Sequence, residues 1–248
     1  MEWILKINIL YEDQQIIVCE KPSGIASQSD NTMQDDMVNL LKNYVFGKGQ
    51  GGEVPYIGIV HRLDRPVGGV MVFAKTPFSA KELSRQIQDK CMEKKYLAVV
   101  SQDLSSELLC EPKSLEDYLV KNGRTNLSSV TDSKNRNGKK AVLSYRILET
   151  VQNGPVLNGT AVPVSVAEIE LMTGRHHQIR VQMSAHNMGI WGDTKYNSLF
   201  QKEKGWFQIG LFAYSLRFDH PKSKKRMEFR LIPETEPFCL FGSLHSFK

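Results

Sequence analysis

Cysteine is scarce in this sequence, and its arrangement would not organise a small fold. The four cysteines are far apart in a chain of 248 residues and form no Cys-x-x-Cys pair: Cys19, Cys91, Cys110 and Cys239. This spacing argues against a zinc ribbon and against a disulfide scaffold. No apolar run approaches membrane-spanning length, and the first residues are too mixed in polarity for a secretory signal. We therefore expect a soluble, cytoplasmic protein that does not enter a membrane.

The motifs of several common enzyme classes are also absent. The glycine-rich stretch 47–52 lacks the Gly-Lys-Ser/Thr ending of a phosphate-binding loop. No Gly-x-Ser-x-Gly supports a serine hydrolase, and no second acid stands out for a glycosidase. The six histidines show no His-Glu-x-x-His spacing, and the adjacent His176 and His177 would point in different directions on a helix. We expect no metal site.

The charge is modest but unevenly distributed. The net charge is +5, from 32 basic and 27 acidic residues, and the first sixty residues are net acidic. Residues 61–100 hold eight basic and four acidic side chains, and a second basic cluster spans 222–226. Basic segments that are separate from acidic ones suit a polyanion partner such as RNA. From charge alone, a solvated lysine-rich surface is the simpler interpretation.

Hydrophobic periodicity predicts more strands than helices. Strands are expected over 7–10, 15–20, 70–74, 93–100, 164–171 and 207–218, with a three-stranded meander in 113–149 and a hairpin partner at 226–231. Helices are expected over 36–46, from Thr76 to about Lys90, and from Thr173 to about Ala185. Since most strands are joined by short turns, the pattern indicates an α+β fold, a mainly antiparallel mixed sheet with flanking helices.

One acidic side chain stands out in the segment 61–70, His-Arg-Leu-Asp-Arg-Pro-Val-Gly-Gly-Val. Asp64 lies between Arg62 and Arg65, just before an expected turn at Gly68-Gly69. A carboxylate on a loop between fixed positive charges can be kept ionised and aimed at a substrate. A surface salt bridge at the end of a strand explains the same pattern equally well.

A second segment, 171–180, carries an arginine that invites a similar interpretation. On a helix capped by Thr173, His176 and Arg180 would share one face, and the first amides would favour an anion such as phosphate. Arg180 would then project beside a catalytic carboxylate. A structural ion pair fits this spacing equally well.

These segments, taken in order, resemble the RluA-type pseudouridine synthases. The resemblance covers nearly the whole chain and is carried by His-Arg-Leu-Asp at 61–64, Lys-Tyr-Leu-Ala-Val-Val at 95–100, Thr-Gly-Arg-His-His-Gln-Ile-Arg-Val at 173–181, Gly-Asp-Thr-Lys-Tyr at 192–196, and the flanking stretches 12–24 and 213–221. It implies a pseudouridine synthase-like catalytic domain. It also implies an isomerase that converts specific uridines to pseudouridine in structured ribosomal or transfer RNA, without cofactor or metal.

The resemblance implies a role for three residues in the chemistry. Asp64 would be the essential acid, which attacks C1′ of the ribose or acts at C2′ to give a glycal. Tyr96 would lie against the base, and Arg180 would pair with Asp64 and orient it. Arg62 resembles a residue that enters the RNA stack when the target base flips out, and its planar guanidinium suits this role.

The resemblance also implies a set of RNA contacts and a domain plan. The expected RNA-binding residues are Arg62, Arg65, His61, Arg175, His177 and Lys95. Residues 1–248 are expected to form a single, monomeric catalytic domain without the small accessory RNA-binding domain that many relatives carry. The alternative is a non-catalytic RNA-binding or RNA-folding protein on the same scaffold.

Two positions depart from the family pattern. Phe212 and Gln182 stand where histidine is expected. Neither replaces a proposed catalytic residue, so the departures affect expected substrate contacts and not the chemistry.

Overall fold

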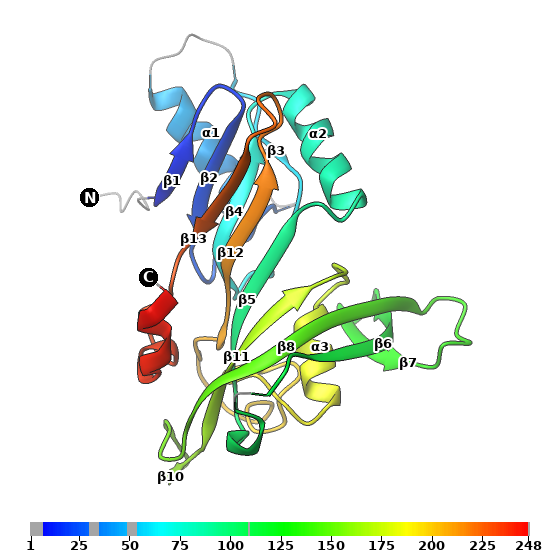
Figure 1. The fold of residues 1–248 in the computed structure, drawn as a ribbon, viewed down its shortest axis with the longest axis vertical. Coiled ribbons are helices and arrows are strands. Elements are labelled where there is room, and N and C mark those ends of the chain that lie inside the picture. The colour runs from blue at the N-terminus through cyan, green and yellow to red at the C-terminus, as the bar shows by residue number, and fades with distance from the viewer. Residues whose placement is uncertain (1–6, 30–34, 49–53, 109, 248) are drawn as a thin grey trace. The chain divides into compact units, whose positions relative to one another are not determined.

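The computed structural model describes residues 7–29, 35–48, 54–108 and 110–247. The chain divides into two compact units (Figure 1): the first contains residues 1–94 and 213–231, and the second contains 95–212 and 232–248. Most of the glycine-rich stretch 47–52 lies outside the described residues. Among the described residues, no helix combines the length and the apolar character needed to cross a bilayer. That residues 1–248 act as a single domain stays a prediction.

The first unit is a sheet with two helices. Its strands are β1 (Ile9–Glu12), β2 (Ile16–Lys21), β3 (Gly58–Ile59), β4 (Gly68–Ala74), β12 (Leu211–Asp219) and β13 (Arg226–Arg230), and its helices are α1 (Met37–Gly47) and α2 (Pro77–Gln88). The strand order is β1-β2-β4-β12-β13, with β3 also on β4. The pairs β1–β2, β2–β4, β3–β4 and β12–β13 are antiparallel.

Helix α2 begins where the sequence predicts it. The Thr76 side chain accepts a hydrogen bond from the Ser79 amide, and Pro77 occupies the first turn. Proline is tolerated there because the first amides of a helix have no partner within the helix. The same helix presents Leu83, which is fully buried, to the core of the unit.

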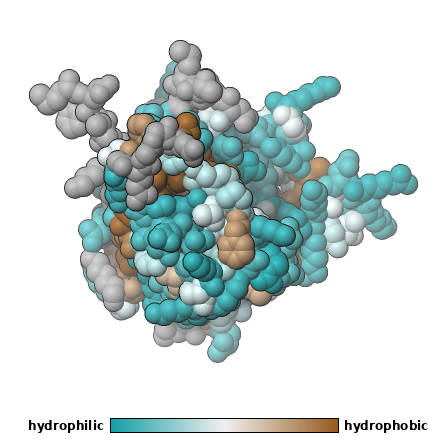
Figure 2. Space-filling view, turned by 90° about the horizontal axis from the view of Figure 1, so that it is seen from above, coloured by the Kyte–Doolittle hydropathy of each residue, from teal (hydrophilic) through white to brown (hydrophobic). Residues whose placement is uncertain are grey.

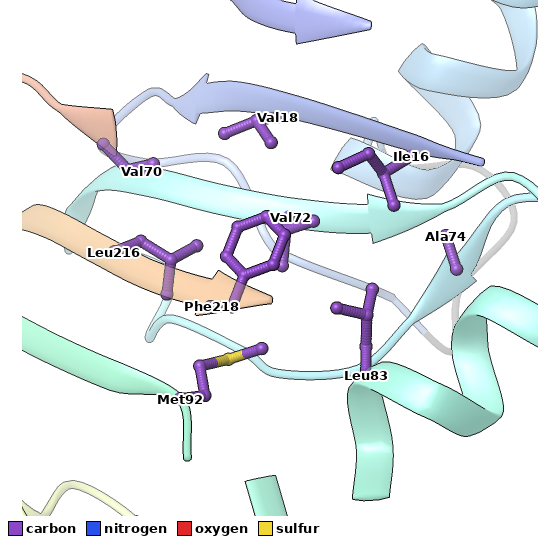
Figure 3. Close-up of a cluster of buried hydrophobic side chains, with 9 residues drawn as sticks. All are labelled: Ile16, Val18, Val70, Val72, Ala74, Leu83, Met92, Leu216 and Phe218. Carbon is purple, nitrogen blue, oxygen red and sulfur yellow. The ribbon is translucent and has the colours of Figure 1, made fainter. Parts of the chain in front are cut away.

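The core of the first unit forms on one face of its sheet (Figure 3). Alternate residues of three strands converge there with Leu83 from α2 and with Met92: Ile16, Val18, Val70, Val72, Ala74, Leu216 and Phe218. The spacing of two is what a strand needs to direct side chains to one face. Every residue of β4 is buried, so this strand is covered on both faces. By contrast, hydrophilic residues predominate on the face of the molecule that Figure 2 shows.

The second unit is an antiparallel sheet in the order β5-β11-β8-β6-β7. The strands are β5 (Glu93–Val100), β6 (Lys113–Asn122), β7 (Leu127–Thr131), β8 (Lys139–Val151) and β11 (Val164–Leu171), with the small hairpin β9 (Val156–Leu157) and β10 (Thr160–Ala161). Helix α3 (Gln178–Ala185) lies against β6 and β7. Short 3-10 turns are η1 (Ser105–Glu107), η2 (Phe238–Leu240) and η3 (Gly242–Phe247).

The α+β class and its mainly antiparallel sheet are confirmed. The meander predicted in 113–149 is present as β6, β7 and β8, and the late hairpin is present as β12 and β13. One expectation is wrong: Gly68 and Gly69 are the first residues of β4 and not a turn. Gly69 has φ +135, and a Cβ there would lie 2.7 Å from the Ala213 Cα. Glycine is needed because another backbone passes too close for a side chain.

We expect Gly69→Ala to destabilise the protein by about 2–5 kcal/mol, since alanine adds both a steric clash and an unfavourable φ. The matched control is Gly123→Ala, because a Cβ at Gly123 meets nothing within 4 Å. It should change the free energy of unfolding by about 1 kcal/mol or less. Urea denaturation measures the difference in stability between the two variants. Equal midpoints for both would contradict the requirement for glycine at position 69.

Candidate functional site

The backbone on both sides of Asp64 is held by hydrogen bonds within the first unit. The buried Ser27 hydroxyl donates to the Leu63 carbonyl at 2.8 Å and accepts from the Leu63 amide at 3.0 Å. On the other side, the Val67 amide donates to the Asp64 carbonyl at 3.0 Å. Asp64 itself is partly exposed. The loop therefore presents a carboxylate from a backbone that has little freedom to move.

Arg65 is part of the same support. The Gly24 amide donates to the Arg65 carbonyl, and the Arg65 Nε donates to the Gly24 carbonyl, both at 2.9 Å. The Ser23 hydroxyl donates to the Pro66 carbonyl at 2.6 Å. Arg65 therefore binds the turn after β2, while Arg62 lies exposed one residue before Leu63. The predicted RNA contacts of both arginines stay predictions.

A buried lysine, Lys21, lies beneath this turn. Its ammonium donates to three carbonyl oxygens, those of Pro22 at 2.8 Å, Ile25 at 2.6 Å and Arg65 at 3.1 Å. Three acceptors match the three N–H bonds of an ammonium group. Burial lowers the pKa of Lys21 to about 7, while the negative charge of Asp64 opposes this shift and Arg65 adds to it. Lys21 is thus within electrostatic range of the Asp64 carboxylate.

His61 begins the loop and binds the next strand. The Val72 amide donates to His61 Nε2 at 3.1 Å, so this ring nitrogen acts as an acceptor. Desolvation, with a smaller effect of Lys94, lowers the pKa of His61 to about 3. A neutral ring is what the acceptor geometry requires. This contact with β4 is structural, and an RNA contact of His61 stays a prediction.

In the second unit, Tyr96 lies on β5 opposite Ile169 of β11 and is buried. The neighbouring Lys95 lies 3.9 Å from the Glu168 carboxylate, which also binds Arg146 Nε at 2.9 Å. Lys95 is partly exposed at the end of this charge network. This partial exposure is compatible with the predicted RNA contact, which stays a prediction.

Arg180 forms a buried ion pair within the second unit. Its Nε and Nη2 each donate to one oxygen of Asp193 at 2.7 Å, and the two side chains are 4% and 1% exposed. The guanidinium also lies over the Tyr196 ring, 5.2 Å from its centroid. A side-on pair and a ring face together determine the plane and direction of a guanidinium. The expected pairing of Arg180 with Asp64 joins residues of different units and stays a prediction.

Helix α3 begins later than the sequence predicts. It starts at Gln178, and His177 precedes it with a left-handed φ of 53. Thr173 does not cap the helix, because its hydroxyl donates to the Gln178 side chain and accepts from the Val142 amide, both at 2.8 Å. The predicted cap at Thr173 is therefore wrong, while the anion site at the first amides of the helix stays a prediction. A tertiary contact with β8 has replaced the local cap.

The two histidines before α3 contribute to a polar network. His177 Nδ1 is 2.7 Å from the Tyr196 hydroxyl, which accepts from the Ser128 amide at 2.9 Å. His176 Nδ1 is 2.8 Å from the Ser128 hydroxyl, and the two imidazole rings stack at 3.8 Å. Arg175 is exposed, and its Nε donates to the Lys140 carbonyl. This network connects β7 to the segment that carries Arg180.

The predicted residues thus fall into two groups. His61, Arg62, Asp64 and Arg65 share one loop of the first unit, and Lys95, Tyr96, Arg175, His177 and Arg180 belong to the second. Lys21, Asp193 and Tyr196 have no role in the sequence-based prediction. The only signal was their presence in the family-like stretches 12–24 and 192–196. Within the described ranges, no three or more His, Cys, Asp or Glu side chains group in a way that would hold a metal ion.

Lys21 makes stability depend on pH. Because its pKa is about 7 in the folded state and 10.5 when unperturbed, the unfolded chain binds more protons between these pH values. Unfolding is then less favourable as pH rises, by about 1.4 kcal/mol per pH unit in this window. The Lys21→Met variant has no ionisable side chain at this position, so its free energy of unfolding lacks this pH dependence. The free energy of unfolding of the wild type should therefore rise relative to this variant between pH 7.5 and 9.5, by about 1 kcal/mol per unit.

The control for this measurement is Lys81→Met on the exposed surface of α2. The difference between the wild type and this variant should not vary with pH over the same range. The free energies of unfolding of the wild type and Lys21→Met should differ by an amount that changes with pH. If this difference is instead independent of pH, the assigned ionisation of Lys21 is contradicted.

Removal of Asp193 should leave a buried guanidinium without its carboxylate. We expect Asp193→Ala to destabilise the chain by about 3–5 kcal/mol, the usual cost of breaking a buried pair. The exposed pair of Lys140 and Glu116 offers a control, since both side chains are about half exposed. Glu116→Ala should cost about 1 kcal/mol or less. Chemical denaturation measures the loss in free energy of unfolding for Asp193→Ala and for Glu116→Ala. Similar losses for the two variants would refute the buried pair.

Comparison with known proteins identifies the family. A family model described as RNA pseudouridylate synthase matches residues 15–185. The chain is 31% identical over 232 residues to an uncharacterized RNA pseudouridine synthase of Helicobacter pylori J99, which covers 92% of this chain and 66% of the relative. It is 31% identical over 241 residues to the ribosomal large subunit pseudouridine synthase D of Vibrio cholerae, in a match that covers 91% of this chain and 67% of the relative. The chain thus spans about two thirds of the length of these relatives.

Two solved structures have the same fold. Human RNA pseudouridylate synthase domain containing 1 superposes with a TM-score of 0.72 at 21% identity, over 96% of this chain and 87% of the other. Human RNA pseudouridylate synthase domain containing 4 superposes with a TM-score of 0.71 at 20% identity, over 96% of this chain and 92% of the other. With a family match over more than half of its length, the chain belongs to the RNA pseudouridylate synthase family.

Proposed function

We propose that this protein converts uridine to pseudouridine in RNA, with Asp64 as the catalytic carboxylate. The observation that supports this most is the Asp64 loop. Its backbone is held through Leu63 on one side and Val67 on the other, while the Asp64 side chain is partly exposed. A carboxylate that is accessible yet fixed in position is what attack on a bound ribose requires.

The proposed reaction is a balanced isomerisation. The N1–C1′ bond of uridine breaks, the uracil turns, and a new bond forms between C5 and C1′. C5 then loses its proton and N1 holds one, so no atom is gained or lost and no redox partner is needed. Asp64 either bonds to C1′ and later leaves, or removes a proton from C2′ to give a glycal and returns a proton to C2′ as the C5–C1′ bond forms. Both routes need one carboxylate close to the sugar.

The other two residues position the reactants in this proposal. Arg180 pairs with Asp64 and orients it, and the contacts of Arg180 with Asp193 and Tyr196 support this role. The side-on pair uses Nε and Nη2, so it also determines where the remaining nitrogen, Nη1, points. Tyr96 packs against the uracil and assists removal of the C5 proton. Arg62, which is exposed, fills the stack when the target base flips out.

The proposed substrate is a structured RNA, with ribosomal RNA as the first candidate and transfer RNA as the second. Two related proteins, one from Vibrio cholerae and one from Zymomonas mobilis, are named for the large ribosomal subunit. They are 31% and 30% identical to this chain, respectively. The protein would act on these RNAs in the cytoplasm, as a monomer and without a cofactor.

The test is to express the wild type and Asp64→Asn in cells that lack the gene, and to map pseudouridine in ribosomal and transfer RNA. We expect the wild type to add pseudouridine at one or more positions and Asp64→Asn to add none, because an amide is neither a nucleophile nor a base. The matched control, Asp89→Asn, changes an exposed aspartate at the end of α2 and should retain activity.

Two results would contradict the proposal. If Asp64→Asn modifies RNA as well as the wild type does, Asp64 is wrongly assigned. If the wild type binds RNA tightly but adds no pseudouridine, the non-catalytic alternative is correct.

A further inference from the structure

An exposed tryptophan on a basic loop of the second unit is not used by the proposed chemistry. Trp206 is 74% exposed, which is unusual for so large an apolar side chain. It lies in the segment 201–206, shortly after the stretch whose Asp193 binds Arg180. The segment also carries two exposed lysines, Lys202 and Lys204.

The two ends of this loop are anchored by aromatic packing. Phe200 is fully buried and lies edge-on to Trp191 at 4.9 Å and to Phe207 at 5.1 Å between ring centroids. The pair of Phe200 and Phe207 brings the two ends of the segment together. Residues 201–206 therefore form a short closed loop on a rigid base, and Trp206 projects from it.

Local backbone geometry helps to present the tryptophan. Gly205, directly before it, has φ +137, and a Cβ there would meet nothing within 4 Å. The glycine is therefore needed for its backbone conformation and not for space. Because the base of the loop is packed, the backbone that carries Trp206 would lose little conformational freedom on binding a partner.

The charges of the loop favour an anionic partner. Neither Lys202 nor Lys204 forms an ion pair within the part of the chain that the structure describes. The single acid of the loop, Glu203, accepts a hydrogen bond from Asn158 at 2.8 Å. Lys195 is also exposed, and its carbonyl accepts from the Gln201 side chain at 3.2 Å, which places its backbone beside the loop. An accessible ring among three lysines combines the two features of single-stranded RNA binding, a stacking face and positive charge.

We propose that residues 201–206 form an RNA-binding platform, in which Trp206 stacks on an unpaired base and Lys202 and Lys204 contact neighbouring phosphates. This proposal rests on RNA being the substrate. A protein partner or a second copy of the chain would use the aromatic surface but would gain little from the concentration of lysines. The platform lies in the same unit as Arg180.

The first experiment measures RNA affinity of the full chain. The probe is a fluorescein-labelled single-stranded oligouridylate of about twelve nucleotides, and the readout is fluorescence anisotropy. We expect Trp206→Ala to raise Kd about five- to a hundredfold, since stacking on one base contributes this much. Trp206→Phe retains an aromatic face and should stay within about threefold of the wild type. Leu199→Ala, which removes an exposed apolar side chain nearby, should leave Kd unchanged.

The second experiment tests the lysines through salt dependence. The double variant Lys202→Ala/Lys204→Ala should lower the slope of log K against log salt by about 1.4, because two phosphate contacts are lost. A double variant with the same change of net charge, Lys134→Ala/Lys139→Ala, removes two exposed lysines elsewhere in the unit and should leave the slope unchanged. Equal slopes for the two double variants would overturn the proposed phosphate contacts.

Tryptophan fluorescence gives a direct readout of stacking. In a Trp3→Phe background, addition of the oligouridylate should quench the emission of Trp206, while the buried Trp191 should not respond. With Trp206→Phe in the same background, the quenching should disappear. Quenching that persists without Trp206 would contradict the platform.

Further outcomes separate the platform from the proposed enzyme activity. If Trp206→Ala raises KM for RNA and leaves kcat unchanged, the platform supplies binding alone, as we propose. If the wild type forms pseudouridine and Trp206→Ala has the same Kd and KM, the platform is refuted and the enzyme proposal stands. If the wild type shows Trp206-dependent RNA binding but no isomerisation, the platform stands and the enzyme proposal is refuted. Dissociation of a dimer by Trp206→Ala, with RNA affinity unchanged, would show self-association and overturn the platform.

Discussion

The hydrogen bonds between the turn after β2 and the Asp64 loop are the constraint on which the candidate site depends. Ser27, Gly24 and Lys21 all bind backbone atoms of residues 63–66. These contacts are made to backbone atoms, so they determine the path of the backbone at Asp64. The buried ammonium of Lys21 is costly to desolvate. Its three carbonyl acceptors offset part of that cost and tie two segments together that are more than forty residues apart in the sequence.

A comparable arrangement holds Arg180 in the second unit. Asp193 binds the guanidinium edge, and Tyr196 lies against its face. Tyr196 is itself bound through its hydroxyl to His177 and to the Ser128 amide. In both units, then, the residue that is proposed to act lies at the end of a chain of contacts made by residues that are not proposed to touch the reacting atoms. Such support is what preorganised sites need, because a loosely held group loses much of its catalytic effect.

The sequence predicts the fold better than it predicts the site. The strands of the meander and helix α2 follow from local signals, namely alternation and the Thr76-Pro77 cap, because burial and capping act over a few residues. The start of α3 does not, because Thr173 is engaged by Val142 of a distant strand. Gly68 and Gly69 have the composition of a turn, but the passing backbone of Ala213 makes glycine necessary inside β4. The burial of Lys21 has no local signal: the Pro22 and Ile25 carbonyls are close to it in the sequence, but the fold must bring the third partner, the Arg65 carbonyl, from 44 residues away.

If the wild-type chain exchanges the N1–C1′ bond of uridine for a C5–C1′ bond, it must also release the hydrogen from C5, and this release can be measured. Purified protein is incubated with ribosomal RNA transcripts made from uridine that carries tritium at C5. Each pseudouridine formed must release one tritium to water, because C5 becomes bonded to C1′. We expect protein-dependent release that reaches a plateau equal to the number of pseudouridines in the digested RNA. No release from ribosomal or from transfer RNA transcripts, with protein that binds both, would contradict it.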